Sequence, residues 1–237
     1  MTETGDYRFL EGNIVGDSLF LSCFDGSHAF LFKAGINDEE LTGKFFSGTH
    51  WSSEWEGIRN EDAELQSPEE LTYVVDDKEV QFNLKDMEGK DFSFPNENYE
   101  GKVTIIQIMG TWCPNCLDET KYYKELYDTY HSDGLEIISI AYETGNDVED
   151  YIESVTRLRN KLSLNFTFLI GGAANKNLAS EHFSMLNKII SFPTSIFIGR
   201  DGQVKRVHTG FNGPGTGEYY TEYVRNTNSL IENLLAQ

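Results

Sequence analysis

The chain has 237 residues, of which 39% are hydrophobic, including 16 Phe and 12 Tyr, so it has enough apolar side chains to fold around a core. Its 39 acidic and 19 basic residues give a formal net charge of −20, which argues against nucleic acid or an anionic membrane as a partner, because both bind cationic surfaces. No apolar run approaches the roughly 20 residues of a spanning helix, and no basic-then-apolar leader is present, so we expect neither a membrane span nor an export signal in this chain.

Residues 1–60 predict an all-β antiparallel meander without a helix. Apolar residues alternate along 19–23, 30–34 and 41–45, and 51–59 is a further strand, the fifth, with Trp51 and Trp55 available for packing. Turn signals separate the runs, at 15–17, 25–26, 37–38 and 48–49. About 60 residues bury little core alone, so we expect the meander to pack on the second domain or to belong to a larger barrel. The acidic, polar segment 61–73 is the predicted linker.

Residues 74–237 predict strands that alternate with helices. A hairpin spans 81–84 and 92–94, and the strand at 103–109 is apolar on both faces apart from Gln107, as a buried central strand is. A helix follows to about residue 130. The pattern then predicts strands at 135–142, 166–170, 194–199 and 203–208, and helices at 147–161, 178–186 and 219–235. This order predicts an α/β domain with a thioredoxin-like layered sheet, which closes with an antiparallel hairpin and a helix.

The motif Gly-Thr-Trp-Cys-Pro-Asn-Cys at 110–116 stands between a buried strand and a helix. Pro114 suits the first helical position, so Cys113 is the predicted N-cap, with its sulfur near the free N–H groups of Asn115 and Cys116. Those donors and the positive helix end favour a thiolate. Cys116 lies one turn along the same face, within plausible bridging distance. The motif therefore predicts a redox-active pair, with one attacking and one resolving sulfur.

Other uses of the two cysteines are less well supported by the sequence. A structural disulfide across so short a loop would constrain the unfolded chain very little. A zinc site needs about four ligands, and only Cys23 and five scattered histidines remain. A copper-carrying metallochaperone of thioredoxin fold would add a distal histidine such as His208, but those proteins usually have three residues between the cysteines. A peroxidatic cysteine normally has a threonine three residues before it, where this chain has Gly110.

With this motif and element order, residues 74–237 resemble the TlpA/ResA-like thiol–disulfide oxidoreductases, which are extracytoplasmic members of the thioredoxin superfamily. The resemblance is carried by 110–116, by Glu119 and by the distant Phe-Pro-Thr at 192–194. It implies that Cys113 is the nucleophile and that Cys116 resolves the mixed disulfide.

The resemblance also implies roles for the residues around the pair. Pro193 would be a cis-proline that sits against the thiols, and Trp112 would cover them and shape the docking surface. Substrate contacts would come from Phe192, whose backbone would be free to pair with an incoming strand, and from Thr194 and Pro114.

Glu119 is expected to lie inward beneath the thiols. Cys116, Glu119, Tyr123 and Tyr127 follow three- and four-residue steps, which place them on one helix face. A carboxyl in that partly desolvated place should have a raised pKa, which suits it to relay a proton for the resolving thiol. The alternative is an ordinary solvent-facing glutamate. Thioredoxin itself has its buried acid at the position of Gln107, whereas the TlpA/ResA group has an acid at the position of Glu119.

The sequence thus predicts a thiol–disulfide oxidoreductase. The Pro-Asn between the cysteines is uncharged and contains no histidine to stabilise the thiolate, which favours a reductase. An oxidant remains the alternative direction. We expect no metal and no cofactor beyond the Cys113–Cys116 disulfide. The partners would be protein thiols or disulfides and an upstream dithiol donor, and the resemblance implies a periplasmic or other extracytoplasmic location. In the alternative of another class, the meander binds a partner and the thiol site is secondary.

Overall fold

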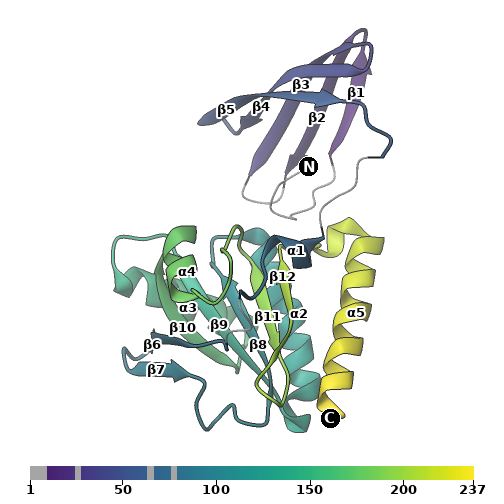
Figure 1. The fold of residues 1–237 in the computed structure, drawn as a ribbon. Helices are drawn as coiled ribbons and strands as arrows, with labels where there is room; N and C mark the ends of the chain where they lie inside the picture. Colours follow the sequence, from purple (N-terminus) through teal and green to yellow (C-terminus); the bar gives the residue numbers. More distant parts are fainter. Residues whose placement is uncertain (1–9, 25–27, 63–66, 76–78) are drawn as a thin grey trace. The chain divides into compact units, whose positions relative to one another are not determined.

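The computed structural model describes residues 10–24, 28–62, 67–75 and 79–237, which belong to two compact units (Figure 1). The first unit is formed by described residues between 8 and 65, and the second by those from 66 to 237. The division falls inside the segment 61–73 that the sequence predicts as a linker. Pro68–Leu71 of that segment form the short helix α1, and Leu71 is buried in the second unit.

The first unit is one antiparallel sheet in which each strand pairs with the next in the chain, as predicted. Its strands are β1 (Glu11–Val15), β2 (Ser18–Phe24), β3 (Ala29–Asn37), β4 (Glu40–Ser47) and β5 (Trp51–Ile58). Gly16, Asp38 and Gly48 have positive φ, which confirms three of the four predicted turns; the turn at 25–26 lies outside the described residues.

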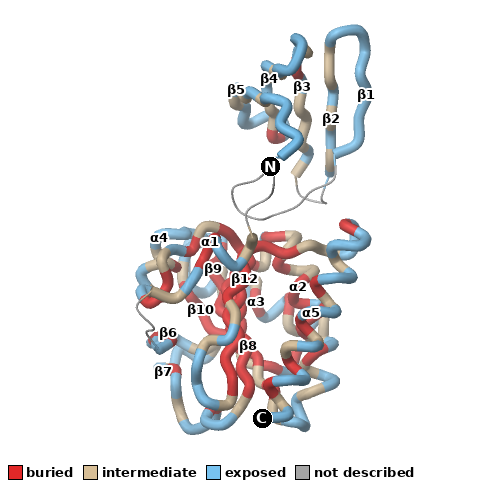
Figure 2. Tube along the Cα trace, turned by 45° about the vertical axis from the view of Figure 1, so that its right-hand side comes forward, coloured by how far each residue is buried: buried red, intermediate tan, exposed pale blue. Residues whose placement is uncertain are grey.

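Aromatic contacts hold the first unit together across its strands. The rings of Phe32 and Phe45 have centroids 4.5 Å apart, and Trp55 and Trp51 approach them edge-on. Among the described residues of this unit only Ala34 and Ser47 are buried, so its core is small, as the length of the meander implies (Figure 2). The expectation that the meander packs on another element stays a prediction.

The second unit is built on a mixed sheet of seven strands in the order β12-β11-β8-β9-β10-β6-β7. The strands are β6 (Phe82–Asp86), β7 (Asp91–Phe94), β8 (Val103–Met109), β9 (Leu135–Glu143), β10 (Thr167–Ala173), β11 (Thr194–Ile198) and β12 (Val204–Thr209). Strands β8, β9 and β10 are parallel, and the two hairpins add to them in antiparallel fashion, one at each edge. The thiol motif therefore starts at the end of a central strand.

The helices agree with the sequence at most of their ends. They are α2 (Pro114–Tyr130), α3 (Val148–Leu162), α4 (Lys176–His182) and α5 (Glu218–Leu235). Helices α2 and α5 run side by side, and the hydroxyl of Tyr122 donates to Asn228 at 2.9 Å (Figure 1). No helix among residues 10–24, 28–62, 67–75 and 79–237 is both long and apolar enough to cross a membrane.

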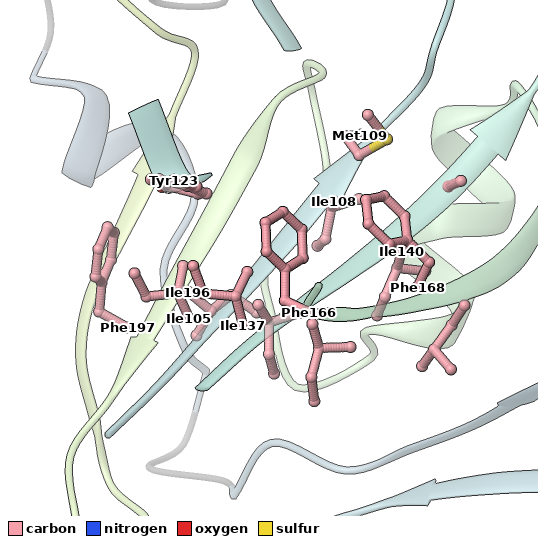
Figure 3. Packing of buried hydrophobic residues seen from close by; sticks show 14 of the residues in the cluster. Ile105, Ile108, Met109, Tyr123, Ile137, Ile140, Phe166, Phe168, Ile196 and Phe197 are labelled. Carbon is pink, nitrogen blue, oxygen red and sulfur yellow. The ribbon is translucent and has the colours of Figure 1, made fainter. Parts of the chain in front are cut away.

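The core of the second unit lies around β8 and β9. All seven residues of β8 are buried, as the apolar run predicts for a central strand (Figure 2). Figure 3 shows side chains from neighbouring strands and from α2 filling this core, among them Ile105, Ile137, Phe168, Phe197 and Tyr123.

Two features of the fold differ from the prediction. The helix predicted at 178–186 begins at Lys176, because the side chain of Asn175 accepts from the N–H groups of Asn177 and Leu178 and caps it two residues earlier. It ends at His182, before the predicted end at 186. The sequence also does not reveal that the Phe94–Pro95 bond is cis, in addition to the Phe192–Pro193 bond that the resemblance implies.

We expect Ile106→Ala in β8 to lower the free energy of unfolding by about 2–5 kcal/mol, because Ile106 is 0% exposed and the substitution leaves a cavity. Urea denaturation measures this loss. The matched control is Val148→Ala at the start of α3, where the side chain is 45% exposed and the change should stay within about 0.5 kcal/mol. Equal effects of the two substitutions would contradict the position of the core.

Candidate active site

The sulfur of Cys113 caps the N-terminus of α2. Cys113 has an extended backbone, Pro114 follows at the first helical position, and the N–H of Cys116 donates to Cys113 Sγ at 3.3 Å. The N–H of Leu117 closes the first helical turn on the Cys113 carbonyl. The predicted cap is therefore confirmed, and it places the sulfur at the positive end of the helix, where a negative charge is favoured.

The two sulfurs differ in access. Cys113 is 7% exposed, whereas Cys116 is 0% exposed, and both are thiols in this structure. Burial raises the pKa of the Cys116 thiol well above its ordinary value, and its hydrogen bond with Cys113 and the nearby Glu119 add to the shift. Cys113 is therefore the more accessible thiol, and Cys116 is a buried thiol that does not readily lose its proton.

The loop before β11 lies against the thiols. The Phe192–Pro193 bond is cis, as the resemblance implies, and the thiol of Cys113 lies 3.5 Å from the carbonyl oxygen of Phe192, to which it donates. That carbonyl is thus engaged in the dithiol form, so pairing of the Phe192 backbone with a substrate stays a prediction. Trp112 is 37% exposed and meets the Phe192 ring edge-on, with centroids 6.0 Å apart.

Thr194, which the resemblance implies as a substrate contact, is buried in this structure. Its side chain is 0% exposed, and its hydroxyl donates to the carbonyl of Ser191 at 2.8 Å. The side chain therefore shapes the turn that leads into β11 and has no exposed surface for a substrate. The backbone of Thr194 is paired on both sides as well, with Ile108 and Thr209. Pro114 is partly exposed at the helix start, and its substrate contact stays a prediction.

Glu119 lies on the inward face of α2, is 0% exposed, and takes part in a buried polar cluster. Gln107 Nε2 donates to its Oε2 at 2.9 Å. Its Oε1 accepts from three hydroxyl groups, those of Tyr123 at 3.2 Å, Ser195 at 3.2 Å and Tyr223 at 3.4 Å. The inward orientation that the helical spacing predicts is confirmed, and the solvent-facing alternative is excluded.

The described residues that bond to Glu119 are polar, and none of them carries a positive charge. Desolvation raises the pKa of Glu119 to about 7, although the hydrogen bonds from Gln107, Ser195, Tyr123 and Tyr223 act in the opposite direction by stabilising the carboxylate. Gln107 is itself held in place, because its Oε1 accepts from Ser139 at 2.7 Å. The site therefore presents a carboxyl group that gains and loses a proton near neutral pH.

Two members of this cluster were not found from the sequence. Ser195 lies in β11 and Tyr223 in α5, 76 and 104 residues from Glu119. The sequence could have pointed to Ser195 only through its place two residues after Pro193, in the strand that pairs with β8. Tyr223 follows from the packing of α5 on the sheet, which the helical pattern alone does not specify.

The metal alternative lacks a ligand set. In the described part of the chain, no three His, Cys, Asp or Glu side chains lie close enough together to hold a metal ion. His208 packs on the ring of Tyr223 at 4.9 Å, and burial lowers its pKa to about 3. Among the described residues no cluster joins His208 to the two cysteines, so the geometry gives the copper-carrier alternative no support, and the absence of a metal stays a prediction. The partner-binding role of the first unit stays a prediction.

The sequence matches one family model and relatives that are named thiol-disulfide oxidoreductases. The model of the AhpC/TSA family matches residues 75–207, which include both thiols, Glu119 and Pro193. The chain is 31% identical over 131 residues to the thiol-disulfide oxidoreductase ResA of Halalkalibacterium halodurans; the match covers 55% of this chain and 66% of that protein, just under two thirds of its length. It is 31% identical over 147 residues to ResA of Bacillus thuringiensis subsp. konkukian, covering 61% of this chain and 73% of the relative.

Among solved structures, the chain is similar to a hypothetical protein of Sinorhizobium meliloti 1021. The TM-score is 0.52 at 16% sequence identity, and the match covers 70% of this chain and 87% of that one. At this identity the likeness concerns the fold alone. Together with the family match and the sheet order, it confirms the thioredoxin-like fold that the sequence predicts.

We expect Glu119→Gln to change how stability depends on pH. The carboxyl has its ordinary pKa of 4.5 in the unfolded chain and about 7 in the fold, so between these values the folded protein keeps a proton that the unfolded chain has released. Stability therefore falls as the pH rises through this window, by about 3 kcal/mol in total, and glutamine removes this loss. Urea denaturation of the reduced proteins should show the variant gaining about 2 kcal/mol on the wild type between pH 5 and pH 8.

The matched control is Asp118→Asn, which removes a neighbouring carboxylate on the outer face of α2, paired with Lys121 at 2.8 Å. That substitution should leave the pH dependence as in the wild type. If Glu119→Gln also leaves it unchanged, the carboxyl is not the buried, neutral-pH group described above.

Proposed function

The chain belongs to the AhpC/TSA family and is a thiol–disulfide oxidoreductase, and we propose that it reduces disulfide bonds of other proteins with the Cys113–Cys116 dithiol. The observation that carries the proposal is the asymmetry of the pair. One sulfur caps a helix and has a little exposed surface, and the other is fully buried one turn further on, above a buried carboxyl.

The first step is an attack by Cys113. Its thiolate forms a bond to one sulfur of the substrate disulfide and expels the other sulfur as a thiolate, which takes up a proton. The N–H of Cys116, at 3.3 Å from Sγ, stabilises the attacking anion. When Cys113 loses its proton, the carbonyl of Phe192 gives up the hydrogen bond from that thiol, while the Ser191 hydroxyl, at 3.3 Å, still donates to it. The lone pair that faced Cys113 then becomes available to a substrate backbone.

The second step resolves the mixed disulfide. Cys116 gives up its proton and attacks the sulfur of Cys113, so the Cys113–Cys116 disulfide forms and the second substrate thiolate leaves. Two electrons thus pass from the dithiol to the substrate. Because burial raises the pKa of Cys116, this step needs a base, and Glu119, with a pKa of about 7, acts as the acceptor of that proton.

The reducing direction is supported by the residues between the cysteines. Pro114 and Asn115 carry no charge, and no histidine stands in the dipeptide to stabilise the thiolate and make the disulfide a strong oxidant. The oxidised pair would be reset by an upstream dithiol donor. The resemblance to extracytoplasmic relatives supports a periplasmic or similar compartment, in which disulfides persist and a reductase has substrates.

We expect the Cys113–Cys116 pair to titrate as one reversible two-electron couple at or below about −250 mV. The measurement is a redox-buffer titration read by the mass shift of thiol labelling, with Cys23 replaced by serine. A midpoint near −120 to −180 mV would make the protein an oxidant or isomerase instead. Absence of a reversible transition would contradict redox function altogether.

We expect Glu119→Gln to slow disulfide reduction about 10²- to 10⁴-fold at neutral pH, the usual contribution of a general base, while the fold stays intact. In the wild type the rate should rise as the pH passes through about 7, because the ionised carboxylate is the active form. Stopped-flow kinetics from pH 6 to pH 9 test both statements, with Asp118→Asn as the matched control. Identical profiles for wild type and Glu119→Gln would remove Glu119 from the mechanism.

A further inference from the structure

We propose that Glu143 is a positioning residue for the nucleophile: its buried carboxylate holds the turn Gly110–Trp112 and, through that turn, the sulfur of Cys113. The inference rests on the proposed function, because the exact position of Cys113 matters to the rate only if Cys113 attacks a disulfide. It concerns a carboxylate that the two exchange steps do not use.

Glu143 lies beside the end of β8, the strand that leads into the thiol motif. It is the last residue of β9 and is 1% exposed. Strands β8 and β9 are parallel neighbours with Met109 opposite Ala141, so the chain leaves both strands at the same edge of the sheet. This register brings the side chain of Glu143 next to the backbone that connects β8 to Cys113.

Both carboxylate oxygens of Glu143 bind one residue of this turn. The backbone N–H of Thr111 donates to Oε1 at 2.7 Å, and the Thr111 hydroxyl donates to Oε2 at 2.6 Å. Hydrogen bonds to an ionised acceptor are shorter and about twice as strong as those between neutral groups. The main chain and the side chain of Thr111 are therefore both fixed to the end of β9.

The adjacent residues of the turn are held at the same place. The indole N–H of Trp112 donates to the carbonyl of Tyr142 at 2.9 Å, and the N–H of Cys113 donates to the carbonyl of Gly110 at 3.1 Å. A Cβ on Gly110 would lie 2.3 Å from the indole nitrogen, so the ring crosses directly over the glycine. Of the contacts that hold the turn, those from Glu143 are the ones that can be charge-assisted.

A carboxylate at this place is costly for the fold. None of the ion pairs among the described residues includes Glu143, and burial raises its pKa while the two bonds from Thr111 oppose that shift. A neutral side chain would satisfy Thr111 at a smaller desolvation cost. The acid is therefore better explained by the rigidity that it gives the turn than by a gain in stability.

Cys113 takes its position from this turn. Its Sγ lies 3.3 Å from the N–H nitrogen of Cys116 and 3.5 Å from the carbonyl oxygen of Phe192, in a gap that leaves little freedom. A displacement of about 1 Å at a reacting group costs on the order of 100-fold in rate. Since Thr111 is two residues from Cys113, loosening of the turn reaches the sulfur directly.

Three substitutions separate the contacts. Glu143→Ala removes both acceptors, Thr111→Val removes the hydroxyl donor but keeps the N–H, and Glu143→Gln keeps an oxygen for the N–H and offers its amide N–H to the hydroxyl. We expect kcat/KM for reduction of a protein disulfide to fall about 100-fold in Glu143→Ala. It should fall about 10-fold in Thr111→Val, and Glu143→Gln should recover it to within about 10-fold of the wild type.

The control is Glu136→Ala, which removes another carboxylate from β9, at the opposite end of the strand, where it pairs with Lys102 at 2.8 Å. This variant should keep the wild-type kcat/KM. A second measurement needs no turnover: hydrogen exchange of the Trp112 indole N–H, followed by NMR in the reduced full-length protein. We expect it to speed up at least about 10-fold in Glu143→Ala, because the turn no longer holds the ring on Tyr142.

Wild-type values of kcat/KM and of indole exchange in a folded Glu143→Ala variant would overturn the proposal. If that variant does not fold, wild-type values of both quantities in Thr111→Val overturn it instead. If the wild-type protein itself reduces no disulfide, the proposed function fails, while faster indole exchange in the variants still supports the positioning contact.

Discussion

The site depends on the way in which the N-terminus of α2 is capped. A helix start leaves backbone N–H groups without partners, and here the sulfur of Cys113 accepts one of them, with Pro114 setting the first helical position. Once the helix begins there, its period places Cys116 one turn below and Glu119 a further turn inward. The same bond thus stabilises the helix, orients the sulfur of Cys113 and places the thiol of Cys116 on the helix face that also carries Glu119.

The interior beneath the thiols is polar, and no Lys or Arg side chain of the described residues bonds to Glu119 there. Glu119 accepts from one amide and three hydroxyl groups, and none of these can neutralise it as an arginine or lysine would. A cation in contact would hold the carboxyl ionised at every physiological pH, whereas uncharged donors leave its pKa near 7. Gln107 in the central strand fits this arrangement, because a second acid so close would compete with Glu119 for the same proton.

Aromatic packing as well as hydrogen bonds holds the residues next to Cys113. Trp112 meets Phe192 edge-on, Phe192 stacks on Tyr142 at 5.6 Å, and the Tyr142 hydroxyl bonds to His182 of α4 at 2.8 Å. Gly171 makes this stack possible, because a Cβ there would lie 2.6 Å from the Tyr142 ring. The thiol motif, the cis-proline loop and α4 are therefore joined through side chains of β9, the strand that also supplies Glu143.

The sequence by itself determined the features that short-range rules control. The apolar run of β8, proline after a capping cysteine, and the helical step to Glu119 are all local, so they could be predicted before the fold was known. Tertiary structure decided the rest. Ser195, Tyr223 and Glu143 reach the site from 76, 104 and 32 residues away from their partners, and the side chain of Thr194 is buried, with its hydroxyl bonded to the carbonyl of Ser191. Their placement depends on strand register and on how α5 packs, which are properties of the whole core rather than of any segment.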